Sequence, residues 1–516
     1  MERNPDHSLT VRWVGLFAGP LLALLVLAGL PDQYRDAAGA AVELGSGARA
    51  TLALMVWMAV WWMTEAIPLP ATSLLPIAVL PLAGAASAGE ATAPYADKLI
   101  FLFLGGFVLA LSMQRWGLDR RIALRVLRLV GTRPVQMVGG VMLVTAFLSM
   151  FVSNTATAAM MLPIALSVVT LLAPDDAAPD DLFGDGDPNF GLCMMLGIAY
   201  AATIGGIGTK IGTPPNGLLL GFIERNYGRE IDFVTWLGVG LPLVAVFLPT
   251  AWWLLTRAIY PVPQQRVRGA EELLERAHRQ LGPLNRGERV TLLVFVLMAA
   301  AWVLRPILAN GYGGEGGLLR VPALLPGLTD AGIAIGGAIL LFSIPADWKN
   351  RTFTMNWDTA RALPWGVLLL FGGGLSLAAA VKANGVDLFI GSLAHAFGAL
   401  PTVLLVVLVT TLVILLTELT SNTATTATLL PVLAPAAVSF GVSPYMLIVP
   451  AALAASCAFM LPVATPPNAV VFGSGYVTIR QMTYAGLWLN LLGIVFVTVL
   501  MYTVVVPLLG IDIGGR

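Results

Sequence analysis

The sequence predicts an all-α, polytopic membrane protein built from two inverted repeats. Apolar residues make up 57 % of the 516 residues and charged residues only 11 %, whereas a soluble domain carries roughly 25 % charged residues. The apolar residues come in long runs, which favour spanning helices over the alternating ten-residue segments of a membrane barrel. Polar motifs interrupt some of these runs, and each of these motifs occurs twice.

The balance of charges excludes several classes of protein. The chain has 29 Lys and Arg and 29 Asp and Glu, so its formal net charge is zero and no nucleic acid partner is expected. A soluble enzyme would lack the polar surface to cover so apolar a core. Cys193 and Cys457 have no metal-ligand spacing, and no P-loop or protease motif is present. We therefore expect neither an enzyme nor an organic cofactor.

Eleven apolar stretches predict membrane spans of roughly 20 residues. They are residues 13–30, 49–66, 68–84, 98–116, 190–225, 232–260, 289–305, 328–345, 362–382, 444–475 and 483–508. Two further apolar segments, 134–172 and 400–437, carry polar clusters in their middles, and each predicts either two spans or a re-entrant hairpin. Residues 264–287 are charged and amphipathic, which indicates an interfacial helix between two halves.

The positions of Lys and Arg predict the orientation. With a cytoplasmic N-terminus, eleven spans and hairpins that re-enter from opposite sides, roughly two thirds of the Lys and Arg residues fall on the cytoplasmic side. The C-terminus then lies outside. The spans predict a multi-pass protein of the plasma membrane, and the short loops favour a bacterial inner membrane.

The two halves of the chain share four motifs in the same order. The pairs are Phe103-Leu-Gly-Gly with Phe371-Gly-Gly-Gly, Gly117-Leu-Asp with Gly385-Val-Asp, Ser153-Asn-Thr with Ser421-Asn-Thr, and Thr213-Pro-Pro-Asn with Thr465-Pro-Pro-Asn. The first three pairs have the same spacing along the chain. Because the first hairpin enters from the cytoplasm and the second from outside, the repeats are inverted, as in many secondary transporters.

The Ser-Asn-Thr motifs lie in the middles of the apolar hairpins, where polar residues are costly. Ser, Asn and Thr are helix N-cap residues, so each motif can begin the returning helix and present free N–H groups to an anion. Their oxygens can also ligate a hard cation. A purely structural hydrogen-bonding role is less favoured, because the motif occurs twice.

The Thr-Pro-Pro-Asn motifs predict breaks within two spans. Two consecutive prolines end the preceding helix, and Thr followed by Pro begins a second one. Such breaks persist at membrane depth only where they line a cavity or are buried in protein. A simple packing kink is the alternative for each motif.

Few charges lie inside the apolar spans: Glu65, Lys210, Lys382 and Glu418. No arginine is available there to bind a carboxylate. If the ligand is a dianion, cations bound with it would supply the compensating charge. Glu418 is predicted to be a hairpin-packing partner, Glu65 a helix-end group and Lys382 a residue at an outer helix end.

These motifs, together with the stretch Thr64 to Thr72 (TEAIPLPAT), resemble those of the divalent anion/sodium symporter family, which carries di- and tricarboxylates or sulfate. The resemblance covers about residues 49–508. It implies a homodimer in the lipid bilayer, in which a transport domain moves against a scaffold by an elevator mechanism. The implied scaffold is 1–133 and 289–399, the implied transport domain is 134–260 and 400–516, and residues 261–288 form a cytoplasmic interfacial linker.

The resemblance also assigns site residues. It places the substrate on Ser153, Asn154, Thr155, Thr213, Ser421, Asn422, Thr423, Thr465 and Pro466. It assigns one sodium site to Ser149, Ser153, Asn154 and the Gly212 carbonyl, and a second to Thr417, Thr420, Asn422 and the Ala464 carbonyl.

Lys210 departs from the family pattern, in which this position is mostly uncharged. Its ammonium group can replace a sodium ion, contact a substrate carboxylate, or simply face water. The leading interpretation is sodium-coupled symport of C4-dicarboxylates or related divalent anions. A sodium-independent exchanger, with Lys210 in place of a sodium ion, and an anion channel are the alternatives. Hydroxyl and amide groups can donate hydrogen bonds to succinate, malate, 2-oxoglutarate, citrate and sulfate alike, so the motifs do not identify the anion.

Overall fold

The computed structural model describes residues 5–35, 40–170, 188–262, 270–311, 322–395 and 400–512. These parts are mostly helical, as predicted. Two small antiparallel sheets are the strands within the described ranges. One pairs β1 (Gln33–Arg35) with β2 (Ala41–Glu43), and the other pairs β3 (Pro345–Asp347) with β4 (Thr352–Phe353).

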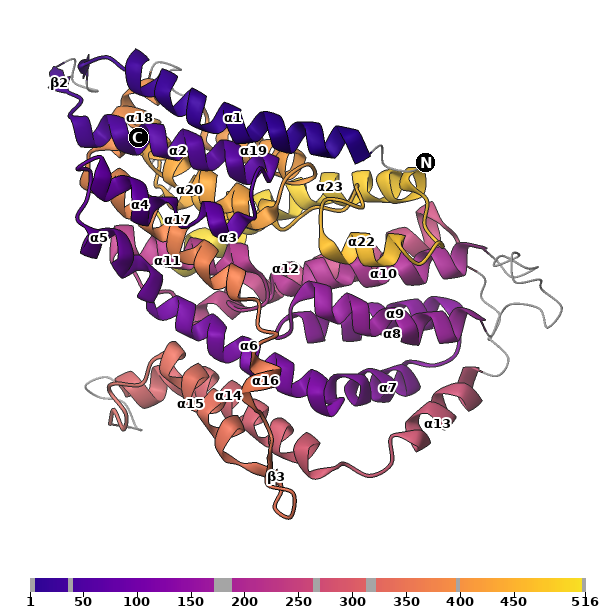
Figure 1. The fold of residues 1–516 in the computed structure, drawn as a ribbon. Coiled ribbons are helices and arrows are strands. Elements are labelled where there is room, and N and C mark those ends of the chain that lie inside the picture. Colours follow the sequence, from indigo (N-terminus) through magenta and orange to yellow (C-terminus); the bar gives the residue numbers. More distant parts are fainter. Residues whose placement is uncertain are drawn as a thin grey trace, which may run out of the picture.

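Helices make up both halves of the chain and are coloured along the sequence in Figure 1. The first half contains α1 (Pro5–Gly29), α2 (Ser46–Thr64), α3 (Leu69–Thr72), α4 (Leu75–Leu82), α5 (Ala88–Thr92), η1 (Ala93–Ala96), α6 (Lys98–Trp116), α7 (Leu118–Val130), α8 (Pro134–Ser149), α9 (Asn154–Val169), α10 (Pro188–Gly206), α11 (Pro214–Tyr227), α12 (Phe233–Trp253) and the π-helical η3 (Leu254–Ile259). The second half contains α13 (Ala270–Gln280), α14 (Arg286–Asn310), α15 (Asp330–Ser343), α16 (Trp357–Ala360), α17 (Trp365–Ala383), α18 (Val386–His395), α19 (Thr402–Thr417), α20 (Asn422–Ser439), α21 (Tyr445–Ala455), α22 (Pro466–Phe472), α23 (Ile479–Leu500), the π-helical η4 (Met501–Val505) and α24 (Val506–Leu509).

Seven helices of the described chain are long and apolar enough to cross a membrane. They are Leu9–Gly29, Ala88–Trp116, Asn189–Gly206, Phe233–Ile259, Arg286–Asn310, Trp365–Ala383 and Ile479–Leu509. Each overlaps a predicted span, which confirms a multi-pass membrane protein. The number of eleven spans stays a prediction.

The predicted span 68–84 is divided into two short helices. The chain forms α3 and α4 instead, with a turn at Ser73 and Leu74 between them. Pro76 lies in the first turn of α4. A proline is tolerated there, because its missing N–H has no intrahelical partner, but it would break a continuous helix.

Both predicted hairpin segments are pairs of helices joined by a short turn. Residues 150–153 join α8 to α9, and residues 418–421 join α19 to α20. The arms α8, α9 and α19 have 16 residues each. At 1.5 Å per residue each arm is about 24 Å long, shorter than the ~30 Å hydrocarbon core of a bilayer. This length favours re-entrant hairpins over two full spans.

The predicted helix breaks are confirmed. Residues 207–213 separate α10 from α11, and residues 456–465 separate α21 from α22. In both cases the second helix begins at the first proline of the motif, with Thr213 and Thr465 as N-caps.

The broken helices and the hairpins pack together. Helix α10 packs against α8, α9 and α22, while α21 packs against α19, α20 and α11. Two pairs of helices also make contacts between the repeats: α11 contacts α20, and α22 contacts α9. This exchange places the ends of both hairpins and both broken helices in one bundle. We call α8–α11 and α19–α22, with α23 beside them, the hairpin body.

A second group of helices lies beside the hairpin body. Helix α6 packs against α15 and α14, and Figure 1 shows α14, α15 and β3 together at its lower edge. The approach of α6 to α15 is close, because a Cβ on Gly105 would lie 2.4 Å from the Ala334 carbonyl oxygen. We call α6, α14 and α15 the frame.

The first part of the predicted linker, residues 263–269, lies outside the described residues. The helix that follows, α13, is amphipathic as predicted and packs against α7. Figure 1 places the N-terminus and α13 toward one end of the molecule and the C-terminus toward the other. This arrangement agrees with termini on opposite membrane sides, which stays a prediction.

Candidate functional site

The Ser-Asn-Thr motifs begin the returning helices of both hairpins. Ser153 is the N-cap of α9, and its hydroxyl oxygen accepts a hydrogen bond from the Ala156 N–H at 3.3 Å. Ser421 is the N-cap of α20 with an extended backbone, without a side-chain capping bond. The N-cap prediction is thus confirmed at both turns.

A compact oxygen cluster forms at each hairpin tip. The Ser149 hydroxyl oxygen lies 2.6 Å from Asn154 Oδ1 and 2.7 Å from the Ala202 carbonyl oxygen of α10. In the second repeat, the Thr417 hydroxyl oxygen lies 2.7 Å from Asn422 Oδ1 and 2.9 Å from the Ala455 carbonyl oxygen of α21.

The chemistry of these clusters fits a hard cation. A hydroxyl carries one proton, so it can donate to only one of its two neighbouring oxygens at a time. Each cluster therefore gathers three neutral oxygens, the donor type that a hard cation prefers. In the described part of the chain no group of three or more His, Cys, Asp or Glu could hold a metal ion. Hydroxyl, amide and carbonyl oxygens of this kind suit a hard cation such as sodium rather than a transition metal.

Asn216 and Asn468 hold the unwound segments in shape. Asn216 Nδ2 donates to the carbonyl oxygens of Gly206, Ile207 and Thr209, the last at 2.7 Å. Asn468 Nδ2 donates to the carbonyl oxygens of Ala458 and Leu461, at 3.3 and 3.0 Å. Both side chains are fully buried, and neither Oδ1 atom has a hydrogen-bond partner among the described residues. Sequence reasoning did not assign these residues a role, although they end the Thr-Pro-Pro-Asn motifs.

Glycines bring the first hairpin and the first broken helix into contact. A Cβ at Gly206 would lie 2.6 Å from Asn154 Oδ1, and a Cβ at Gly212 would lie 2.4 Å from the Gly206 carbonyl oxygen. Side chains at these positions would push the unwound backbone away from the oxygen cluster.

We predict that Gly206→Ala raises the sodium concentration for half-maximal transport about tenfold or more. The added methyl group displaces the Asn154 amide, and overpacking of this kind costs about 1–3 kcal/mol. Transport in liposomes at increasing sodium concentrations measures the effect. Gly336→Ala is the matched control, because a Cβ there would have open space around it. Equal sodium dependence of the two variants would contradict the prediction.

Glu418 caps the second unwound segment. Its carboxylate accepts hydrogen bonds from the N–H groups of Phe459, Met460 and Leu461 at 2.8–3.1 Å, and from Asn490 Nδ2 at 2.7 Å. The side chain is buried. These contacts support its predicted role as a packing partner of the hairpin.

We expect Glu418→Gln to lower the free energy of unfolding by about 1–3 kcal/mol. Glutamine replaces one accepting oxygen with an NH₂ group, which would face backbone donors and leave them unpaired. Thermal unfolding of the detergent-solubilised protein tests this. Glu65→Gln is the control, since Glu65 is half-exposed at the end of α2, in line with its prediction as a helix-end group. A Glu418 variant as stable as this control would refute the capping role.

The remaining assigned residues lie at the ends of the same helices. Thr155 and Thr423 follow the motif asparagines in α9 and α20, while Thr213, Thr465, Pro466, Gly212 and Ala464 lie at the starts of α11 and α22. Thr420 is turned differently. Its hydroxyl lies 2.8 Å from the Leu416 carbonyl oxygen and 2.6 Å from the Thr425 hydroxyl. These two hydrogen bonds involve neither Thr417 nor Asn422.

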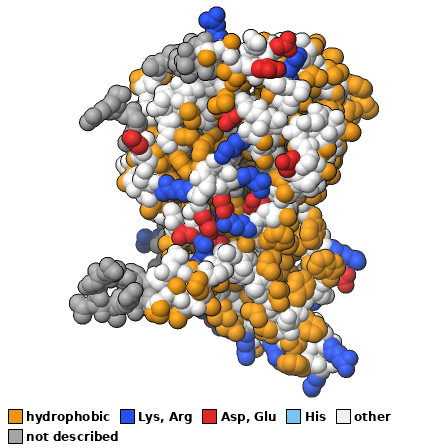
Figure 2. Space-filling model, turned by 90° about the vertical axis from the view of Figure 1, so that its left-hand side faces the viewer, with side chains coloured by type: hydrophobic (Ala, Val, Ile, Leu, Met, Phe, Trp, Pro, Cys, Tyr) orange, Lys and Arg blue, Asp and Glu red, His pale blue; other side chains and the backbone are white. Residues whose placement is uncertain are grey.

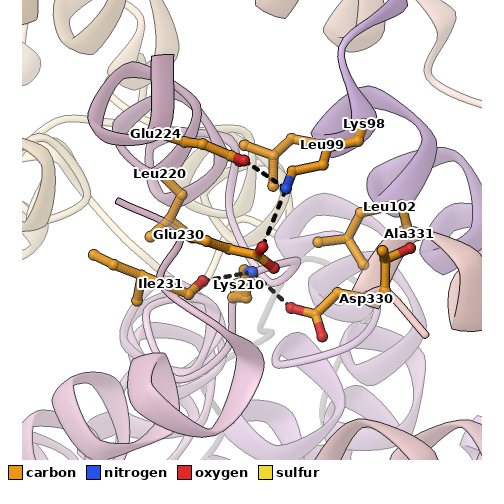
Figure 3. Close-up of a pocket in the computed structure, with 11 residues that line it drawn as sticks. Lys98, Leu99, Leu102, Lys210, Leu220, Glu224, Glu230, Ile231, Asp330 and Ala331 are labelled. Atoms are coloured by element: carbon orange, nitrogen blue, oxygen red, sulfur yellow. Dashed lines mark hydrogen bonds and ion pairs between the residues drawn. The ribbon is translucent and has the colours of Figure 1, made fainter. Parts of the chain in front are cut away.

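Lys210 is not exposed to water, which removes one of its three interpretations. The side chain is buried, and its ammonium group donates to Asp330 Oδ2 and to the Ile231 carbonyl oxygen, both at 2.7 Å (Figure 3). Asp330 begins α15 in the frame. Sequence reasoning missed this partner, which lies far along the chain. Lys382, in contrast, is exposed at the end of α17 and donates to the Asn226 carbonyl oxygen.

Comparisons with known proteins give a consistent result. The family described as "Sodium:sulfate symporter transmembrane region" matches residues 40–511. The chain is 40 % identical over 505 residues to the sodium-dependent dicarboxylate transporter SdcS of Staphylococcus saprophyticus, covering 97 % of this chain and 92 % of that protein. The SdcS protein of Staphylococcus aureus strain NCTC 8325 is also 40 % identical, over 502 residues and with the same coverage.

Two solved structures share the fold at low sequence identity. The YdaH transporter of Alcanivorax borkumensis superimposes with a TM-score of 0.57 at 15 % identity, covering 98 % of this chain and 99 % of that one. MtrF of Neisseria gonorrhoeae also gives a TM-score of 0.57, at 12 % identity, with 97 % and 95 % coverage.

Proposed function

We propose a function from the following premise: the chain belongs to the sodium:sulfate symporter family of membrane transporters. The proposed function is to couple the import of a C4-dicarboxylate to the inward movement of sodium ions. The relatives at 40 % identity are named sodium-dependent dicarboxylate transporters. Together with the family match, these names support a transporter rather than an enzyme.

The paired oxygen clusters at Asn154 and Asn422 carry the proposal. Each cluster joins a hairpin tip to the end of a broken helix, and each offers hydroxyl, amide and carbonyl oxygens at short distance. Sodium ions bound there would bring positive charge next to the N-termini of α9 and α20. Together with the positive ends of these helix dipoles, they would hold a dicarboxylate without an arginine.

The mechanism that we propose is of the elevator type. The hairpin body holds the substrate and moves as a unit against a scaffold that includes the frame. The described packing supports this division, because the hairpins and broken helices contact one another across the repeats. We further propose a homodimer in a bacterial inner membrane, with the N-terminus in the cytoplasm and the C-terminus outside.

The exchanger alternative assigns the role of a sodium ion to Lys210. The buried pair with Asp330 argues against this assignment, because the lysine charge is already balanced by a carboxylate of the frame. The same pair leaves the clusters at Asn154 and Asn422 to be completed by cations from solution.

Uptake of radiolabelled succinate by liposomes tests the function. One set of empty liposomes receives an inward sodium gradient, and another set, without sodium, is preloaded with succinate. We expect uptake only with the sodium gradient. Uptake only in the preloaded set would establish an exchanger. No uptake in either set would refute dicarboxylate transport, and sulfate and citrate would then be tested in the same way.

A further inference from the structure

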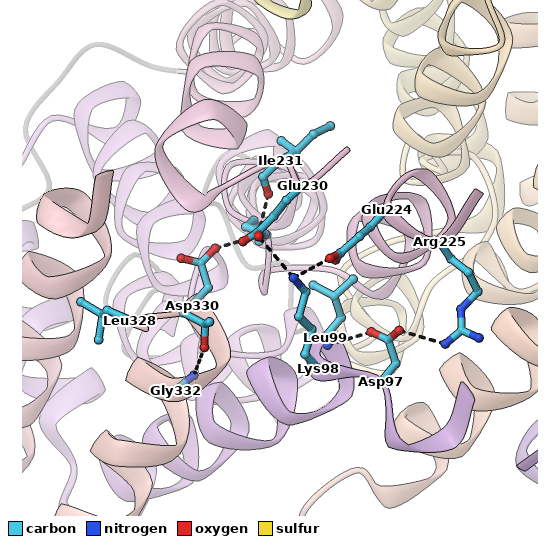
Figure 4. Close-up of polar contacts among 12 residues, drawn as sticks. Asp97, Lys98, Leu99, Glu224, Arg225, Glu230, Ile231, Leu328, Asp330 and Gly332 are labelled. Carbon is cyan, nitrogen blue, oxygen red and sulfur yellow. Dashed lines mark hydrogen bonds and ion pairs between the residues drawn. The ribbon is translucent and has the colours of Figure 1, made fainter. Parts of the chain in front are cut away.

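A chain of ion pairs runs from the surface into the protein interior. It joins Glu224 to Lys98 at 2.5 Å, Lys98 to Glu230 at 3.2 Å, Glu230 to Arg305 at 2.9 Å, Arg305 to Asp330 at 3.4 Å, and Asp330 to Lys210 at 2.7 Å. A further pair, Arg225 with Asp97 at 3.1 Å, lies beside it (Figure 4). Four cations thus face four carboxylates. We call these eight residues the ion-pair network.

The network lies where two parts of the molecule meet. Figure 2 shows acidic and basic side chains gathered across the middle of one end of the molecule, between a broad upper part and a narrower lower part. The side chain of Lys98 is 41 % exposed, whereas those of Lys210 and Asp330 are 3 % and 5 % exposed. The network therefore begins at the surface and ends at a buried pair.

Every pair in the network but one joins the frame either to the hairpin body or to the loop 228–232 that follows α11. Asp97 and Lys98 belong to the start of α6, while Arg305 and Asp330 belong to α14 and α15. Their partners lie on the other side: Lys210 in the unwound segment, Glu224 and Arg225 in α11, and Glu230 in the loop that follows. Within the network as described, Arg305 with Asp330 is the pair that stays on one side.

The buried residues of the network, Lys210 and Asp330, can pair in only one arrangement of the hairpin body and the frame. A desolvated charge is tolerated in a membrane protein only when a partner neutralises it. If the hairpin body slides along the frame, Lys210 and Asp330 separate and each needs a new partner or water. The paired arrangement is therefore favoured over intermediate positions.

We propose that the ion-pair network is a latch, which holds the hairpin body in the position seen here and opens in each transport cycle. The proposal rests on the proposed elevator function. Lys210 makes the latch sensitive to the cation site as well, because it lies two residues before Gly212 in the unwound segment. A change in this segment on sodium binding would be transmitted directly to the Lys210–Asp330 pair.

The distance between two spin labels, measured by electron paramagnetic resonance, tests the latch. The labels are attached at Lys349→Cys, next to the frame, and at Arg480→Cys, in α23 of the hairpin body, which are both exposed. The two buried native cysteines, Cys193 and Cys457, are replaced with alanine. The wild-type background is expected to favour the spacing seen in this structure over a second one.

Three variants loosen the latch at different depths. Asp330→Asn and Lys210→Met break its buried end, and Lys98→Met breaks its exposed end without leaving a buried charge. We expect the ratio of the present spacing to the second spacing to fall at least about tenfold in the buried variants and less in Lys98→Met. The exchanged pair, Lys210→Asp with Asp330→Lys, should restore part of the ratio. Arg12→Gln, which breaks an exposed pair with Glu65, should leave it unchanged.

The outcomes separate the latch from the transport function. If the wild type shows both spacings and takes up succinate, but Asp330→Asn and Lys98→Met leave the ratio unchanged, the latch is refuted and the proposed function stands. If the wild type shows a single spacing under all sodium and succinate conditions and no uptake, both are refuted.

Discussion

Replacing Asn154 or Asn422 with alanine is expected to lower sodium-dependent succinate uptake by at least about a hundredfold. Each asparagine supplies the amide oxygen of its cluster, and that oxygen lies within 2.7 Å of the Ser149 or Thr417 hydroxyl oxygen. Alanine removes the amide oxygen and leaves only two oxygens in each cluster: the hydroxyl oxygen of Ser149 or Thr417 and the carbonyl oxygen of Ala202 or Ala455. The loss is therefore one of the three oxygens of the proposed sodium site, together with a group that the family resemblance assigns to the substrate.

Asn384→Ala is the matched control for this pair. Asn384 is also half-buried, and its amide donates to the carbonyl oxygens of Ala85 and Ala380, at the end of α17. We expect this variant to keep most of its uptake. Asn154 and Asn422 variants that transport as well as Asn384→Ala, at equal protein levels in the liposomes, would show that the clusters are not the site.

The second large effect is expected for Asn216→Ala and Asn468→Ala. Their side chains bind the carbonyl oxygens of the unwound segments, three in the first repeat and two in the second. Loss of each bond to a buried carbonyl costs about 1–3 kcal/mol. We expect Asn216→Ala to lower the free energy of unfolding by several kcal/mol and to abolish uptake, with a smaller loss of stability for Asn468→Ala.

Asn226→Ala separates this role from the general cost of removing an asparagine. Asn226 donates to a single carbonyl oxygen, that of Phe222, within its own helix. Thermal unfolding in detergent and uptake in liposomes are measured for all three variants. If Asn216→Ala is no less stable than Asn226→Ala, the amide does not hold the unwound segment.

The sequence predicts the local features of the site well, because they depend on neighbouring residues. Two consecutive prolines are tolerated in the first turn of a helix but not in its interior, so the breaks before Pro214 and Pro466 follow from the motif itself. In the same way, a serine before an apolar run is a good N-cap, and Ser153 and Ser421 occupy that position.

The contacts between distant segments could not be predicted in this way. Nothing in the sequence near Lys210 indicates Asp330, which lies beyond α11, α12, the interfacial helix α13 and α14. The same holds for Glu418. The backbone N–H groups that donate to its carboxylate belong to a segment whose shape depends on the break before Pro466. Partners of buried charges therefore need the tertiary structure, even where the need for a partner is evident from the sequence.

Binding of radiolabelled sodium to the purified protein tests the central claim most directly. We predict saturable sodium binding that succinate strengthens, and its loss in a variant that combines Asn154→Ala with Asn422→Ala. Succinate should in turn bind the wild type only when sodium is present, because in the proposed site the sodium ions supply the positive charge that holds the dicarboxylate. Sodium binding that persists in the double variant, or succinate binding that is equally strong without sodium, would contradict the account.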